Sequence, residues 1–157
     1  MSPLVATTLS LSLAVPFVPQ EKTTCGAASL AMVLRYWGST ATHDEIARDV
    51  VQSELKGALG SRLVEFARAR GFFAIAYEGD LQQLRDSLAK ERPLVVAWNL
   101  GKTPYHNVVV LGVETAGRRL LVNDFELGPR RWVDENAFES CWTGADHWTL
   151  LVLPGQR

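Results

Sequence analysis

The order of the periodic segments predicts an α+β fold in which N-terminal helices pack on an antiparallel sheet. Helical patterns dominate the chain up to about residue 90, and strand-like patterns dominate the remainder. The chain has 157 residues, of which 47% are apolar and 21% charged, as in soluble domains with a core of their own. It contains no repeats or low-complexity segments, so we expect residues 1–157 to form a single domain.

The N-terminal segment has the two-residue period of a half-buried strand. Between residues 9 and 15, large apolar side chains alternate with serine and alanine. Residues 3–15 are also apolar enough for the core of a signal peptide, but the first basic residue is Lys22. We therefore expect residues 1–14 to be an N-terminal strand, with a signal remnant as the alternative. This apolar run is too short to span a membrane.

Four later segments carry helical signals, most of them with a matching cap. Gly38 and Gly71 stop the first and third helix, and Thr42 with Glu45 forms a capping box for the second. Asp80 caps the fourth. The expected helices cover Cys25–Trp37, His43–Gln52, Ser61–Arg70 and Leu81–Ala89.

Six further segments have strand character and are separated by Gly, Pro or Asp. The turn at 116–117 joins two of them into a hairpin. A cleft would then form where helices meet the sheet, with Cys25 on the helical half and His106 on the sheet half. The expected strands cover Phe73–Tyr77, Pro93–Asn99, His106–Val113, Arg119–Asn123, Arg130–Val133 and His147–Leu153.

Charge and cysteine content exclude several functional classes. The net charge is −1 and Lys and Arg are scattered, so we expect no nucleic-acid or membrane surface. The two cysteines, Cys25 and Cys141, match no clustered metal motif, and we expect neither metal nor cofactor. One disulfide between them is compatible with the count. The segment around Cys141, ESCWTG, indicates a packing role for that residue.

Cys25 has the position of a reactive thiol rather than a packing one. It stands where a polar loop gives way to a helix, and unpaired N–H groups at a helix start stabilise a thiolate. Gly26 leaves room for a substrate backbone. Such a nucleophile also needs a base that takes its proton and passes it to the leaving group.

Three histidines are candidates for this base. His106 opens a predicted strand, where its ring can be held rigidly, whereas His43 lies at a polar helix start. His147, at the entry of the last strand, remains an alternative. Asp124 ends the next strand of the hairpin, and the start of one antiparallel strand lies near the end of the next. We therefore expect Asp124 to orient His106, with a plain turn-forming role as the alternative.

Two further features complete the predicted surroundings of the site. Gln20, five residues before Cys25, can donate its side-chain amide to an oxyanion together with the Cys25 N–H. An ordinary loop residue is the alternative. Trp98 and Trp142 are expected in the core, although either could line the cleft.

The blocks QEKTTCGAASLAMVLRYWG, HNVVVLGV and VND resemble the papain-like cysteine peptidases of the bacteriocin-processing, double-glycine leader type. The pattern is closer to their stand-alone relatives in bacterial envelope proteins than to transporter-fused domains, and it covers roughly residues 15–153. The resemblance implies a papain-like fold with the site in the cleft. It also implies a Cys-His-Asp mechanism in which Cys25 is the nucleophile, His106 the base, Asp124 its orienting group and Gln20 an oxyanion donor.

These expectations define a cysteine peptidase that acts on a peptide or protein. The same residues also serve other thiol acyl-transfer enzymes, such as amidases of cell-wall peptides and transglutaminases. A non-catalytic peptide-binding domain is the alternative from another class. We expect a place in the cell envelope, in the periplasm or outside the cell, with the cytoplasm as the alternative. No oligomeric state is predicted.

Overall fold

The structure is a computed structural model. It describes residues 10–19, 25–51, 59–99, 106–114, 116–124 and 127–155. The helices are α1 (Cys25–Tyr36), α2 (His43–Val51), α3 (Leu59–Ala69), α4 (Leu81–Ala89) and α5 (Glu135–Thr143). The strands are β1 (Ser10–Ser12), β2 (Phe73–Glu78), β3 (Leu94–Trp98), β4 (His106–Glu114), β5 (Arg119–Asp124), β6 (Gly128–Asp134) and β7 (Trp148–Leu153).

The strands of the described residues form one antiparallel sheet, as predicted, in the order β2-β7-β3-β4-β5-β6. β4 is its central strand, and all nine of its residues are buried. One edge of β4 pairs with β3 over residues 106–110 and with β1 over residues 112–114. At Gly112 a Cβ would come within 2.7 Å of the Leu11 carbonyl oxygen, so β1 can approach only a glycine here.

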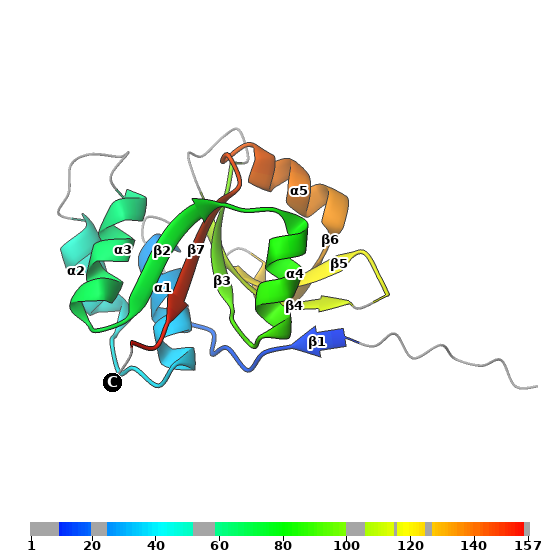
Figure 1. The fold of residues 1–157 in the computed structure, drawn as a ribbon. Coiled ribbons are helices and arrows are strands. Elements are labelled where there is room, and N and C mark those ends of the chain that lie inside the picture. Colours follow the sequence, from blue (N-terminus) through cyan, green and yellow to red (C-terminus); the bar gives the residue numbers. More distant parts are fainter. Residues whose placement is uncertain are drawn as a thin grey trace, which may run out of the picture.

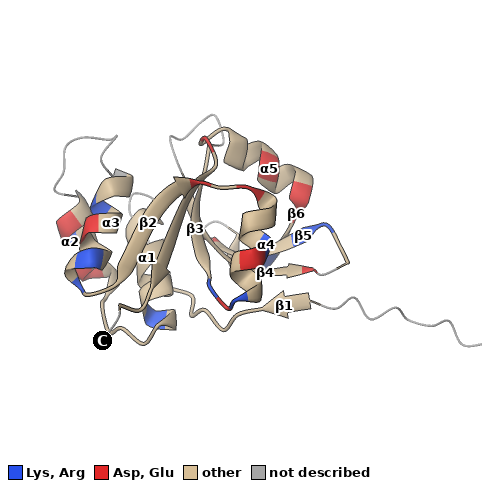
Figure 2. Cartoon of the chain, viewed as in Figure 1, with Lys and Arg blue, Asp and Glu red and all other residues tan. Residues whose placement is uncertain are grey.

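Helices cover both faces of this sheet (Figure 1). In that view α1 lies behind the sheet, α4 lies in front of β3 and β4, and α2 and α3 lie beside β2. Ten of the twelve residues of α1 are buried, because the side chains around almost the whole helix are small or apolar. The charged residues lie mainly on the outer helices and around β5 and β6 (Figure 2). The fold is thus the predicted α+β arrangement.

The predicted helix boundaries agree closely with the structure where a cap defines them. The Asp80 side chain accepts from the Gln83 N–H at 2.8 Å and forms a capping box at α4. Thr42 Oγ1 accepts from the Glu45 N–H at 3.2 Å at the start of α2. Gly38 and Gly71 have φ of 88° and 87°, the left-handed conformation that ends α1 and α3.

Within the described residues, the N-terminal strand ends at Ser12, before the predicted end at residue 14. β1 covers three residues, after which Leu13 and Val15 remain buried in the core and the Leu13 N–H donates to the Leu111 carbonyl at 2.8 Å. The two-residue period therefore identified the apolar face correctly, while the ladder pairing with β4 stops at Ser12. The first nine residues of the predicted 1–14 segment lie outside the described residues.

Helix α5 has no counterpart in the sequence-based prediction. Its N-cap is Asp134, whose side chain accepts from the Asn136 and Ala137 N–H groups. Phe138 and Trp142, four residues apart on one helix face, are both fully buried. The Asp cap followed by this aromatic pair is the signal that could have revealed α5.

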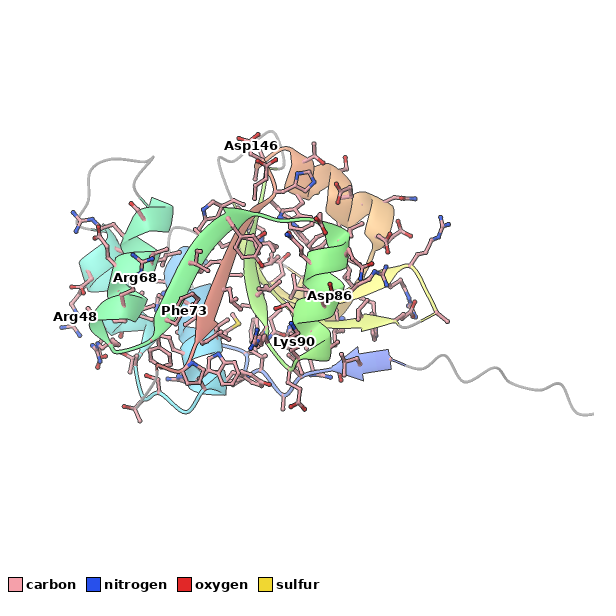
Figure 3. The ribbon with its side chains drawn as sticks, viewed as in Figure 1. Arg48, Arg68, Phe73, Asp86, Lys90 and Asp146 are labelled. Atoms are coloured by element: carbon pink, nitrogen blue, oxygen red, sulfur yellow. The ribbon has the colours of Figure 1, made fainter. Side chains whose placement is uncertain are left out.

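The outer part of the sheet is less well covered than its centre. β2 is an edge strand, and its Phe73 and Ile75 side chains are 52% and 41% exposed (Phe73 is labelled in Figure 3).

Each helix that the structure describes is either too short or too polar for a bilayer-spanning segment.

Candidate active site

Cys25 is the first residue of α1, and its side chain is buried against the start of β4. The backbones of Gly26 and Asn107 hydrogen bond to its sulfur, and the His106 side chain does so as well. The first turn of α1 contains no acidic residue that would oppose a negative charge here. The predicted position of a thiol at a helix start is therefore the observed one.

His106 opens β4 and is held between a carboxylate and the Cys25 thiol. Its Nε2 lies 2.5 Å from Asp124 Oδ1, and both side chains are about 95% buried or more. Because the Asp124 carboxylate interacts with Nε2, the other ring nitrogen, Nδ1, is available to the Cys25 thiol. Asp124 is the last residue of β5, next to an irregularity in the pairing with β6. Antiparallel hairpin geometry thus brings the two residues together as predicted.

The electrostatics of the pair favour a charged thiolate and a charged imidazole. Burial would raise the pKa of Cys25, but hydrogen bonds from His106 and from the Asn107 and Gly26 backbones lower it below its usual value. Burial would lower the pKa of His106, yet the hydrogen bond with Asp124 and the interactions with Cys25 raise it to about 9. The arrangement can therefore hold a nucleophilic sulfur beside a proton donor.

Asn107 is a site residue that the sequence-based prediction missed. Its side-chain Oδ1 lies 3.7 Å from Cys25 Sγ, and the residue is only 6% exposed. Val109 pairs with Asn123, which contacts Met32 of α1, so this face of β4 points to α1. Asn107 lies two residues before Val109 and shares that face. A polar residue within the apolar run HNVVVLGV was the available signal.

Asn123 fixes the end of β5 on the face opposite to Asp124. Its Nδ2 donates to the Val15 carbonyl at 3.4 Å and to Met32 Sδ at 3.7 Å, and its Oδ1 accepts from the Arg130 N–H at 2.9 Å. These bonds connect β5 to the N-terminal segment, to α1 and to β6. The hydrogen bonds of Asn123 therefore fix the backbone next to Asp124.

Trp98 packs beside the histidine. Its ring centroid lies 6.2 Å from that of His106 and 5.5 Å from that of Phe138, and the residue is buried. Trp142 is fully buried and stacks edge-on against Phe138 at 5.3 Å. Both tryptophans are therefore core residues, and the alternative that Trp142 lines a cleft is wrong.

The remaining candidates lie elsewhere or outside the described residues. Gln20 is outside them, so the structure says nothing of its predicted place. His147 Nε2 bonds to Glu139 Oε1 at 2.5 Å on α5, and His43 Nδ1 lies 3.3 Å from Asp44 at the start of α2. Cys25 and Cys141 are not joined by the disulfide that their number would allow.

No group of three or more His, Cys, Asp or Glu side chains that could hold a metal ion occurs among the residues that the structure describes.

Comparison with known proteins places the chain in a family. The Peptidase_C39 like family matches residues 12–148. The peptidase domain of Streptococcus ComA, a bifunctional ABC transporter involved in a quorum-sensing pathway, is 25% identical with a TM-score of 0.71. That match covers 92% of this chain and 98% of the ComA domain. Comparison with the curated proteins gives no match.

A second solved structure is also similar to this chain. It is a double-glycine-motif protease from an AMS/PCAT transporter in complex with the leader peptide. It is 29% identical with a TM-score of 0.73, and the match covers 91% of this chain and 94% of that one. The family match spans most of the chain, and the fold and the thiol site agree with it. This chain therefore belongs to the Peptidase_C39 like family and is a papain-like cysteine peptidase.

Proposed function

We propose that the protein hydrolyses peptide bonds through a triad of Cys25, His106 and Asp124. The observation that carries the proposal is the continuous chain of side-chain interactions from the Cys25 thiol through the His106 ring to the Asp124 carboxylate. The pKa shifts have the signs that the reaction needs, since the pKa of Cys25 is lowered and that of His106 is raised to about 9.

In the first half of the reaction, the Cys25 thiolate attacks the carbonyl carbon of the scissile bond. The oxyanion of the tetrahedral intermediate is held by the Cys25 N–H and, as a further part of the proposal, by the Gln20 side-chain amide. The His106 imidazolium gives its Nδ1 proton to the leaving amine as the C–N bond breaks. The products of this step are the free amine and a thioester on Cys25.

In the second half, neutral His106 takes a proton from water as the water oxygen attacks the thioester carbonyl. The C–S bond then breaks, which releases a carboxylic acid and restores the thiolate beside the imidazolium. Asp124 fixes the ring so that Nδ1 faces the sulfur in both halves of the reaction.

For the substrate, we propose a peptide or a protein segment. One solved relative is a double-glycine-motif protease in complex with a leader peptide, so peptides with a double-glycine motif are the first probes to use. A location in the cell envelope or outside the cell stays part of the proposal.

The test is a cleavage profile on a peptide library that includes double-glycine peptides. The wild type and the Cys141→Ala variant should cleave the same peptides, whereas Cys25→Ala should be inactive with an unchanged circular-dichroism spectrum. Product that appears only when an amine is added would favour acyl transfer instead. Peptide affinity without turnover in the wild type would contradict the proposal and favour a binding domain.

A further inference from the structure

The geometry points to Asn107 as a positioning residue for the nucleophile: we propose that its side-chain amide donates a hydrogen bond to the ionised Cys25 sulfur. The inference rests on the proposed role of Cys25 in catalysis. It adds to the triad a group whose task is to hold the thiolate rather than to move a proton.

The first argument is the position of Asn107. Its Oδ1 lies 3.7 Å from Cys25 Sγ, and the residue is buried. Within the described part of the chain, the pairing of β4 with β5 begins at Val109, and the first residues of β4 pair with β3. The backbone of Asn107 also bonds to the sulfur. One residue thus offers the thiolate both its main chain and its side chain.

The second argument is the chemistry of the carboxamide. With Oδ1 toward the sulfur, the amide can accept a hydrogen bond from the S–H of a neutral thiol. An ionised sulfur has no proton to give and would face the negative end of the amide dipole. Rotation of the terminal amide by 180° exchanges the oxygen for the Nδ2 group, which is a donor. Among the described residues, the Asn107 carboxamide has no other hydrogen-bond partner, so this rotation breaks no second bond.

The third argument is the sulfur's surroundings. The ionisable group that faces Cys25 from β4 is His106, and Asp124 stands behind it on β5. The first turn of α1 contributes no acidic group. The sulfur is buried, and a poorly hydrated anion depends on each donor that reaches it. An Nδ2–H from Asn107 would be such a donor, on the α1 side of β4.

The test measures the rate of iodoacetamide labelling of Cys25 against pH in the wild type, Asn107→Ala and Asn107→Asp, with peptide mapping by mass spectrometry. Cys141 in the same samples is the reference thiol. The midpoint is the pH at which the labelling rate of a thiol reaches half of its maximum. Loss of one hydrogen bond to a charged group should move this midpoint for Cys25 upward by roughly one pH unit in Asn107→Ala. Asn107→Asp keeps the shape but brings a negative charge, so its midpoint should rise further.

The outcomes separate this inference from the proposed function. A wild-type midpoint for Cys25 as high as that of Cys141 would contradict the proposed function itself. A low wild-type midpoint that is unchanged in both variants would overturn only the role of Asn107. A lower midpoint in Asn107→Ala would also overturn the role of Asn107, because the amide would then stabilise the neutral thiol in the wild type. Circular dichroism of each variant shows that the labelled protein is folded.

Discussion

Two regions of this molecule contain the same residue types in different surroundings. The first region, at the start of α1, the end of β3 and the start of β4, holds a cysteine, a tryptophan and a histidine that lies 2.5 Å from a carboxylate oxygen. The end of α5 and the turn into β7 hold the same combination, again with a histidine–carboxylate distance of 2.5 Å. The first set is Cys25, Trp98, His106 and Asp124, and the second is Glu139, Cys141, Trp142 and His147.

The difference between the regions is in burial and in what faces the sulfur. The side chains of the His106 pair are 5% and 3% exposed, whereas those of the His147 pair are 22% and 39% exposed. Burial alone acts on Cys141 and raises its pKa, while the partners of Cys25 outweigh burial and lower its pKa. A histidine–carboxylate pair in the same region is therefore not sufficient to lower the pKa of a cysteine, since the thiol must also face hydrogen-bond donors.

The largest expected effect concerns the two histidines. His106→Ala should reduce kcat/KM for peptide cleavage by about 10³-fold or more, because it removes both the proton donor and the partner of the thiolate. His147→Ala is the matched control and should leave kcat/KM within about twofold. The two variants are compared under steady-state conditions at neutral pH. An equal loss in both would remove the distinction between the regions.

A smaller loss is expected from the carboxylate. Asp124→Asn should lower kcat/KM by about 10²-fold, since the His106 ring loses its orientation and its charge partner. The pKa of His106 should also fall from about 9 toward its ordinary value of 6.5. Glu139→Gln, at the other pair, should change neither quantity. Nuclear magnetic resonance titration of the His106 ring measures the pKa, and an unchanged value would contradict the role of Asp124.

Much of this fold could be predicted because its local signals agree with its global pattern. Asp80 and the glycines at 38 and 71 mark helix ends that need no tertiary information. The hairpin between β4 and β5 fixes which strand ends meet, so the proximity of His106 and Asp124 follows from the turn. Cys25 was recognisable because a polar loop changes to a helical pattern at that residue.

Other features depend on contacts that a single sequence does not specify. Helix α5 is stabilised by the burial of Phe138 and Trp142, and it is the fold that brings both side chains into the core. The contact between Asn107 and the sulfur requires the register of β4 against α1. The end of β1 at Ser12 lies where β3 takes over the pairing with β4. The predicted role of Gln20 stays a prediction.

The smallest expected effect is the alkaline limit of the wild-type activity. His106 must be protonated to release the amine, and its pKa is raised to about 9. Activity should therefore persist through neutral pH and then fall about tenfold per unit as the pH rises above 9. The Cys141→Ala variant should follow the same profile. A decline centred near 6.5 would show that Asp124 and Cys25 do not raise the pKa of His106.

The most direct test of the account is to trap the covalent intermediate. Wild-type protein is mixed with a cleavable peptide in excess, quenched in acid within milliseconds, and analysed by intact mass and peptide mapping. We predict a mass increase equal to the acyl part of the peptide, attached as a thioester to Cys25 and absent from Cys25→Ala. Efficient peptide hydrolysis in Cys25→Ala, or an acyl group on Cys141 instead, would contradict the central claim that Cys25 is the nucleophile.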